Sequence, residues 1–225
     1  MKHVVLILVL WICSIFLHAQ LGYGVKVGAG IASLHTTMGE NQFFTPTPAW
    51  YGGIYDTYTI NPSFSVQSTL AFSSKGYRDY VRDGAIKYND YFRVHSIELI
   101  PLQFFYTPGL KRGKILVGAG PVLSYGLQGR WRQKSFISSI PNSSGKLVFV
   151  NDLKDAPNDI TVGVYGKKFE FGGILSLGYQ FKKRLSVLVN GTGSLQNIAP
   201  KSNGKKPTYT DRNLTAYASL LYQIR

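Results

Sequence analysis

Residues 169–181 read Phe-Glu-Phe-Gly-Gly-Ile-Leu-Ser-Leu-Gly-Tyr-Gln-Phe, and this stretch decides the fold. Its odd positions are mostly large and apolar, whereas its even positions are mostly small or polar and include Glu170, Ser176 and Gln180. Successive side chains of a β-strand point to opposite faces of the sheet. The alternation therefore predicts a strand with one apolar and one polar face.

Similar segments recur along the whole chain, and most of them show the same clean alternation. The sequence predicts eight strands of about 12 to 15 residues, which is long for a soluble sheet. Two of them, 49–60 and 93–107, carry apolar residues on both faces, so their inward and outward sides are not assigned. The eight are Leu21–Leu34, Ala49–Ile60, Ser63–Lys75, Arg93–Thr107, Ile115–Leu127, Phe169–Phe181, Leu185–Asn197 and Asn213–Arg225.

The connections between these strands alternate in length. Short ones span 61–62, 108–113 and 182–184, and long ones span 35–48, 78–92, 128–167 and 198–212. Short turns on one side and long loops on the other are typical of outer-membrane barrels. We predict an all-β, eight-stranded antiparallel up-and-down transmembrane β-barrel with both termini in the periplasm. The alternative is a soluble barrel of the lipocalin type with an apolar cavity, which the unequal loops and aromatic strand ends disfavour.

The N-terminus predicts export. Met1-Lys2-His3 precedes an apolar run from Val4 to Leu17, and a small residue, Ala19, follows. This is the pattern of a cleaved signal peptide over 1–19, which leaves 20–225 as the outer-membrane barrel domain. An uncleaved membrane anchor is the weaker alternative, because the run is short for a spanning helix. The single cysteine, Cys13, lies within this segment, and the bulky residues before it do not fit a lipoprotein site.

Several polar side chains fall on the inward face by parity. An eight-stranded barrel has a lumen just wide enough for side chains to fill, so we expect a buried polar network that plugs it. A narrow solute path lined by charge is the alternative. The expected lumen residues are Lys26, Gln67, Lys75, Glu170 and Gln180.

The formal net charge of +14 is carried mostly outside the strands. Basic outer loops would meet the phosphates of lipopolysaccharide, so outer-membrane lipid and lipopolysaccharide are the expected partners, and nucleic acid is not. Solvated loops with no specific partner are the alternative. The basic periplasmic turns comprise Lys111, Arg112, Lys182, Lys183 and Arg184, and the basic outer loops include Arg130, Arg132, Lys134, Lys205 and Lys206.

Groups that could support catalysis are few. The predicted mature chain has two histidines, His35 and His95, and Asp79, Asp83 and Asp90 precede the second. A hydrolase needs a nucleophile, a base and an orienting group held together, and no motif joins these residues. The aspartates also lack the spacing of a calcium loop. The sequence predicts no enzyme, no cofactor and no metal site.

The chain resembles the outer-membrane β-barrel proteins of Bacteroidota, known as the porin family or PorT-like proteins. The residues that carry the resemblance are 18–20, Gly22–Gly28, Ile97–Leu102, Val117–Pro121 and Arg212–Leu214. The resemblance implies an eight-stranded outer-membrane barrel and, for PorT-like members, a link to type IX secretion. One departure is the ending Tyr222-Gln223-Ile224-Arg225, because such barrels usually end in an aromatic residue.

Two functions follow as hypotheses. The first is an accessory or assembly component of an envelope machine such as type IX secretion, which contacts envelope proteins through its basic turns. The second is a stand-alone structural or adhesive surface barrel whose loop 128–167 contacts external partners. A diffusion porin is a distant third, because eight strands leave little room for a channel.

Overall fold

The computed structural model describes residues 21–38, 42–83, 86–110, 112–135, 141–182 and 184–224. The predicted signal peptide over 1–19 lies outside the described residues, as do Lys111 and Lys183. Among the described residues, no helix is long and apolar enough to span a membrane.

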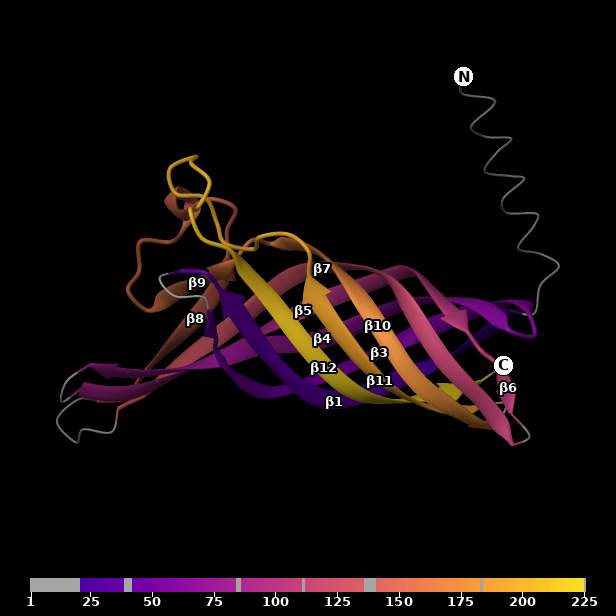
Figure 1. The fold of residues 1–225 in the computed structure, drawn as a ribbon. Helices are drawn as coiled ribbons and strands as arrows, with labels where there is room; N and C mark the ends of the chain where they lie inside the picture. Colours follow the sequence, from indigo (N-terminus) through magenta and orange to yellow (C-terminus); the bar gives the residue numbers. More distant parts are fainter. Residues whose placement is uncertain are drawn as a thin grey trace, which may run out of the picture.

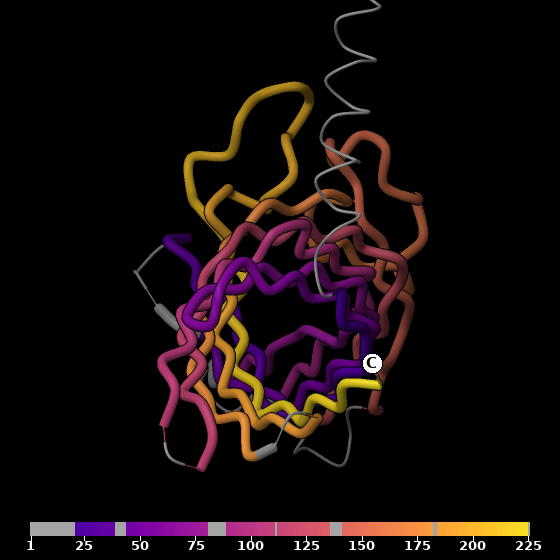
Figure 2. The backbone as a smooth tube through the Cα atoms, turned by 90° about the vertical axis from the view of Figure 1, so that its right-hand side faces the viewer, coloured from indigo at the N-terminus to yellow at the C-terminus, as the bar shows by residue number. Residues whose placement is uncertain are grey.

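Eight long strands form a closed ring in the order β1-β3-β4-β5-β7-β10-β11-β12, and β12 pairs with β1 to close it (Figures 1 and 2). Every neighbouring pair in the ring is antiparallel. This confirms the predicted all-β, eight-stranded antiparallel architecture. The strands are β1 (Leu21–Thr36), β3 (Thr45–Asn61), β4 (Phe64–Asp83), β5 (Ile86–Tyr106), β7 (Gly113–Ser135), β10 (Phe169–Lys182), β11 (Leu185–Ser194) and β12 (Asp211–Gln223).

Shorter elements lie at the ends of the ring. They are β2 (Gln42–Phe43), β6 (Gly109–Leu110), β8 (Ser143–Phe149), the 3-10 turn η1 (Leu153–Asp155) and β9 (Val162–Gly166). The first residues of β1 and the last of β12 lie at the same end as β6 and the short connections, which we call the turn end (Figure 1). The long connections, with β8 and β9, lie at the opposite or loop end.

The wall of the ring has opposite polarity on its two faces. On β10 the outward Leu175 and Leu177 are 70% and 59% exposed, whereas the inward Ser176 is 4% exposed. The same alternation runs along β1, where Val25 and Val27 are exposed and Lys26 is buried. The apolar outward face and polar inward face match the predicted parity, and a closed ring leaves no unpaired strand edge.

The two strands left unassigned by the sequence are now resolved. In β3, Ala49, Tyr51 and Tyr55 point inward and are buried, while Trp50 and Ile54 are exposed. In β5 the register shifts on both sides of the strand between Leu99 and Phe104, which marks a β-bulge. A bulge adds one residue to one strand and so reverses the alternation beyond it.

Ile100 and Gln103 therefore both point inward, with 0% exposure each, although their positions differ in parity. A single alternation applied to the whole strand mixes the two faces, which is why the inward and outward sides of 93–107 are not assigned from sequence.

Two predicted loops are partly strands. Residues 78–83 and 86–92 were expected in a long loop, but β4 and β5 continue through them as a paired hairpin. Likewise β7 continues to Ser135, pairs with β8, and β8 pairs with β9 in parallel. The strands rise above the ring on its β4–β5–β7 side, and β8 extends that raised sheet.

Candidate functional site: the closed lumen

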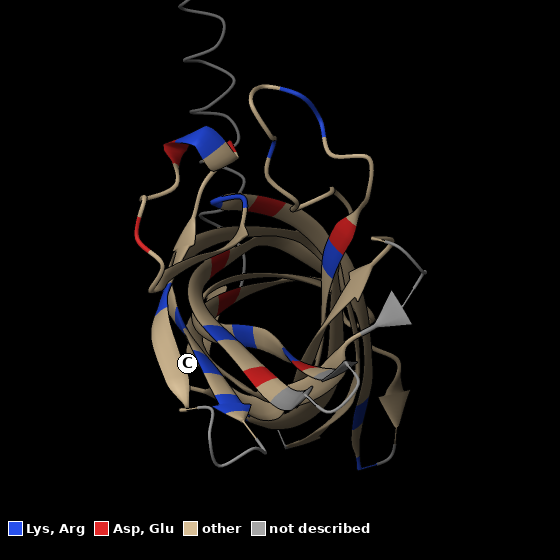
Figure 3. Cartoon of the chain, turned by 90° about the vertical axis from the view of Figure 1, so that its left-hand side faces the viewer, with Lys and Arg blue, Asp and Glu red and all other residues tan. Residues whose placement is uncertain are grey.

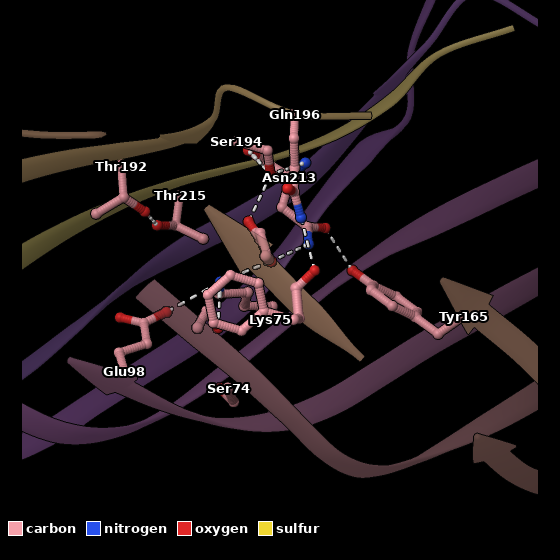
Figure 4. Close-up of polar contacts among 12 residues, drawn as sticks. Ser74, Lys75, Glu98, Tyr165, Thr192, Ser194, Gln196, Asn213 and Thr215 are labelled. Carbon is pink, nitrogen blue, oxygen red and sulfur yellow. Dashed lines mark hydrogen bonds and ion pairs between the residues drawn. The ribbon is translucent and has the colours of Figure 1, made fainter. Parts of the chain in front are cut away.

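A buried ion cluster lies inside the ring toward the loop end. Nζ of Lys75 on β4 lies 3.0 Å from Oε1 of Glu98 on β5 and 3.1 Å from Oε2 of Glu170 on β10 (Figure 4). It also donates a 3.1 Å hydrogen bond to Ser124 Oγ. All three side chains point inward because of their strand parity, and the ammonium of Lys75 donates hydrogen bonds to Ser124 and Glu170.

The two carboxylates have different surroundings. Glu170 accepts hydrogen bonds from Ser194 Oγ and from Asn213 Nδ2, the latter at 3.0 Å. Neither oxygen of Glu98 meets hydrogen-bond geometry with a described residue, although its side chain is only 1% exposed. Glu98 therefore depends on the charge of Lys75 far more than Glu170 does.

The cluster is joined to a loop strand. The hydroxyl of Tyr165, on β9, donates a 2.7 Å hydrogen bond to Asn213 Oδ1, and Asn213 in turn contacts Glu170 (Figure 4). Tyr165 is 8% exposed. A chain of polar contacts thus connects the lumen to the segment that covers its loop end.

A second polar network lies deeper in the lumen. Lys26 Nζ donates to Asn190 Oδ1 at 3.3 Å, and Ser176 Oγ donates to the same oxygen at 2.7 Å. Gln103 Nε2 donates to Ser176 Oγ at 2.7 Å, and Asn190 Nδ2 donates to Ser219 Oγ at 2.9 Å. Strands β1, β5, β10, β11 and β12 are cross-linked through these side chains.

The structure brings together only some of the predicted lumen residues. Lys75 and Glu170 form an ion pair, and Lys26 lies in the second network. Gln67 donates to Thr69 on its own strand at 3.1 Å, and Gln180 lines a cavity at the turn end. Sequence reasoning did not find Glu98, because the parity of its strand was not assigned.

Apolar side chains close the lumen above and below these networks. At the loop end, Leu34 and Val94 of the wall pack with Leu147, Tyr165 and Ile198 of the loop segments, which we call the loop-end cluster. At the turn end a second cluster is formed by Tyr55, Phe105, Leu188 and Leu221.

Beyond the second cluster lies the turn-end cavity, with a volume of about 100 Å³. Its lining is rich in hydroxyl and amide groups, such as those of Thr57, Gln67 and Gln180. Pockets for drug-sized ligands are about 300–1,000 Å³, so this cavity suits a few water molecules or a very small solute. Among the described residues, no group of three or more His, Cys, Asp or Glu side chains could hold a metal ion.

The loop segments at the outer mouth are fastened to one another. Asp152 accepts hydrogen bonds from the backbone N–H groups of Lys154 at 3.2 Å and Gly204 at 2.6 Å, and Leu153 N donates to Lys201 O at 2.8 Å. Desolvation works against the charge of Asp152, but these donors outweigh it and hold the pKa of its carboxyl below the ordinary value.

The predicted basic residues of the outer loops are exposed but lie on different elements. Arg130, Arg132 and Lys134 lie on β7, while Lys205 and Lys206 lie on the connection between β11 and β12 (Figure 3). At the turn end, Arg112 and Arg184 are exposed, and Lys182 ends β10. The predicted loop location of Arg130, Arg132 and Lys134 is wrong, because the strand pairing continues through them.

The residues considered for a hydrolase do not converge. His95 faces outward and its ring packs against Trp50 and Phe72, at centroid distances of 5.9 and 5.7 Å. Asp79 and Asp90 lie directly opposite each other on the inward face of β4 and β5. His95 and these carboxylates are therefore on opposite faces of one sheet.

Comparisons with known proteins reveal likenesses of architecture. No family model and no curated protein sequence matches the chain. The attachment invasion locus protein Ail of Yersinia pestis, in complex with the heparin analogue sucrose octasulfate, is 9% identical over 91% of this chain and 99% of Ail, with a TM-score of 0.44. A second structure of Ail is 9% identical over 90% of this chain and 98% of Ail, with a TM-score of 0.42. Neisserial surface protein A is 14% identical over 89% of this chain and 96% of its own, with a TM-score of 0.42.

Proposed function

We propose that this protein is an integral outer-membrane β-barrel with a closed lumen, which acts at the cell surface through its outer wall and loop segments. The observation that carries the proposal is the inverted polarity of the ring, with an apolar outside and a polar inside. The turn end, with both chain ends, would face the periplasm, and the loop end would face the cell exterior.

The outward apolar side chains form a continuous belt contributed by all eight strands. In water such a belt would be a large exposed apolar surface, whereas in lipid it is the expected lining. A closed ring also satisfies every backbone group within the wall, as a membrane requires. Exposed members include Val27, Ile54, Leu70, Leu99, Val117, Leu175, Val189 and Leu220.

The filled lumen argues against passage of solutes. Apolar clusters close the lumen at its two ends, and two polar networks lie between them. Side chains such as Lys26, Ile100, Gln103 and Leu188 are at most 1% exposed. An open channel would leave wall side chains in contact with water, so the burial supports a plugged barrel.

Two measurements test the proposal. The chain has a single cysteine, Cys13, in the predicted signal peptide, so a cysteine placed elsewhere would be the sole thiol of the mature protein. In intact cells a membrane-impermeant maleimide should label Lys205→Cys but not Arg184→Cys, and both after the outer membrane is opened. Labelling of Arg184→Cys in intact cells would overturn the orientation.

The purified barrel should also give no step conductance in planar bilayers. Regular conductance steps from the wild-type protein would overturn the closed lumen. A variant with a cavity in the loop-end cluster, Leu147→Ala, is a useful comparison, because a plug that depends on packing should leak when that packing is reduced.

A role in type IX secretion remains a second proposal. It rests on the resemblance to PorT-like proteins and on the exposed basic side chains of Arg112 and Arg184 at the turn end. A deletion strain would then lose cargo proteins from the medium and accumulate them in the periplasm. An unchanged extracellular proteome would argue against the secretion role, and the surface role would be the one remaining proposal.

A further inference from the structure

Three cations stand side by side on the outer wall near the loop end. Arg93 on β5 is the cross-strand partner of Arg130 on β7, and Arg130 is the partner of Lys146 on β8. All three side chains are exposed. Neighbouring strands are about 4.8 Å apart, so the three backbone positions span about 10 Å. We call this row, with the row described next, the cation ladder.

A second row lies two residues farther along the same face. Arg78, Tyr91 and Arg132 are successive cross-strand partners on β4, β5 and β7. The guanidinium of Arg78 lies 4.4 Å from the centroid of the Tyr91 ring, and its Nε has no hydrogen-bond partner among the described residues. The two rows of the ladder therefore contain five cations, of which Arg78 is only partly exposed and has a buried Nε.

Like charges directly opposite one another destabilise a sheet. No ion pair joins Arg93, Arg130 or Lys146 to a carboxylate of a described residue. The charge of Lys146 acts on Asp159, whose carboxylate accepts 2.8 Å hydrogen bonds from the backbone N–H and from the hydroxyl of Thr161. Those bonds, with a smaller contribution from Lys146, lower the pKa of Asp159. One edge carboxylate does not neutralise five cations.

The height of the ladder above the proposed membrane interface follows from the aromatic residues on the wall below it. Tyr125 and Phe169 are cross-strand partners on the outward face of β7 and β10, and both are exposed. Exposed aromatics at strand ends mark a membrane interface. Arg130 follows Tyr125 by five residues, which at about 3.3 Å per residue and a tilt of 35–45° places the ladder roughly 12–14 Å higher.

We infer that the cation ladder binds the phosphate groups of the lipopolysaccharide that surrounds the barrel in the outer leaflet. The ladder faces sideways, away from the barrel axis, so a lipid neighbour can reach it while its acyl chains lie against the apolar belt. The height matches the sugar–phosphate layer just above the interface. Guanidinium groups hold phosphate oxygens in a bidentate geometry, which suits Arg93, Arg130 and Arg132.

The inference rests on the proposed outer-membrane orientation, and its test is independent of that orientation. The full-length barrel, purified in detergent, is titrated with fluorescent lipid A that carries both phosphates. The variant is Arg93→Gln/Arg130→Gln/Lys146→Gln. The matched control is Lys201→Gln/Lys205→Gln/Lys206→Gln, which removes the same charge from exposed sites on another loop. The heat-dependent mobility of folded barrels on gels checks that each variant folds.

The ladder variant should bind lipid A at least about ten-fold more weakly than wild type, because each charge-assisted contact is strong, and the control should bind within about two-fold of wild type. Dephosphorylated lipid A should bind wild type as weakly as the variant binds intact lipid A. If the triple variant does not fold, Arg130→Gln alone should still weaken binding several-fold.

Equal binding by the ladder variant and wild type would overturn the inference. The inference would also be overturned if the wild-type protein bound phosphatidylglycerol as tightly as lipid A, because that would indicate general binding to anionic lipids. Displacement of bound lipid A by a soluble sulfated polysaccharide at low concentration would assign the ladder to a soluble polyanion instead. If the maleimide labelling contradicts the orientation but lipid A still binds through the ladder, the proposed orientation is wrong and the ligand is right. If the labelling agrees with the orientation but lipid A does not bind through the ladder, the ligand is wrong.

Discussion

Replacing Lys75 with methionine tests the lumen plug most directly. The substitution keeps an unbranched side chain, one heavy atom shorter, but removes the cation that lies 3.0 Å from Glu98 and 3.1 Å from Glu170. Breaking a buried ion pair from one side costs about 3–5 kcal/mol, because a buried charge is left without a partner. Glu170 keeps two other donors, Ser194 and Asn213, so we assign most of that cost to Glu98.

We therefore expect Lys75→Met to lower the free energy of unfolding by about 3–5 kcal/mol. The measurement is reversible urea unfolding in lipid vesicles, followed by the fluorescence of Trp50 and Trp131. The control is Lys205, an exposed lysine whose side chain forms no ion pair or hydrogen bond with a described residue, and Lys205→Met should change stability by less than about 0.5 kcal/mol.

A double-mutant cycle locates the cost. Glu98→Gln removes the carboxylate with no hydrogen bonds, so Lys75→Met/Glu98→Gln should be more stable than Lys75→Met by at least about 1 kcal/mol. A decrease in the free energy of unfolding of less than about 1 kcal/mol in Lys75→Met would refute the reasoning. It would mean that water, rather than the lysine, stabilises the charge of Glu98.

Three further outcomes follow from other parts of the structure. Tyr165→Phe removes the hydrogen bond to Asn213 and should cost about 1–2 kcal/mol, with faster proteolysis of the loop segment, measured on the folded barrel in vesicles. Leu175→Arg places a charge at the middle of the lipid-facing side of β10 and should cost about 2–4 kcal/mol in the same unfolding assay, whereas Leu175→Ala should cost less. The pKa of Asp152 is lowered, so its contribution is present above the ordinary aspartate pKa and is lost as the pH falls through the lower folded value. Amide exchange at Gly204, after correction for intrinsic rates, should therefore accelerate below about pH 4, and Asp152→Asn should remove that dependence.

The ring could be predicted from sequence because each wall face has a single chemistry. Along β10, outward-facing leucines alternate with inward-facing serine and glycine, so period two survives in the sequence. The same rule fails in β5, where the bulge between Leu99 and Phe104 reverses parity within one strand. The position of a residue in β5 then does not predict whether its side chain faces inward or outward. The place of Glu98 in the ion cluster therefore could not be predicted.

The loop end was less predictable for a different reason. Above the interface both faces of a strand can meet water, so Arg78, Asp79 and Asp90 no longer show an apolar period and resemble a loop. The pairing of β4 with β5 nevertheless continues through them. Tyr165 could not be found either, because its contact with Asn213 joins residues 48 apart in the sequence and depends on how the loop folds back.

The lumen cation and the cation ladder differ in the source of the negative charge that pairs with them. Lys75 points inward, and two carboxylates pair with it, one from the adjacent strand β5 and one from β10 across the lumen. Arg93 and Arg130 point outward from the continuation of the same sheet, and no carboxylate of a described residue forms an ion pair with them. A desolvated charge must be paired internally, whereas a charge at an interface can be paired by the surroundings. In the proposed membrane orientation, this asymmetry favours a structural role for the inner cluster and anion binding by the outer ladder.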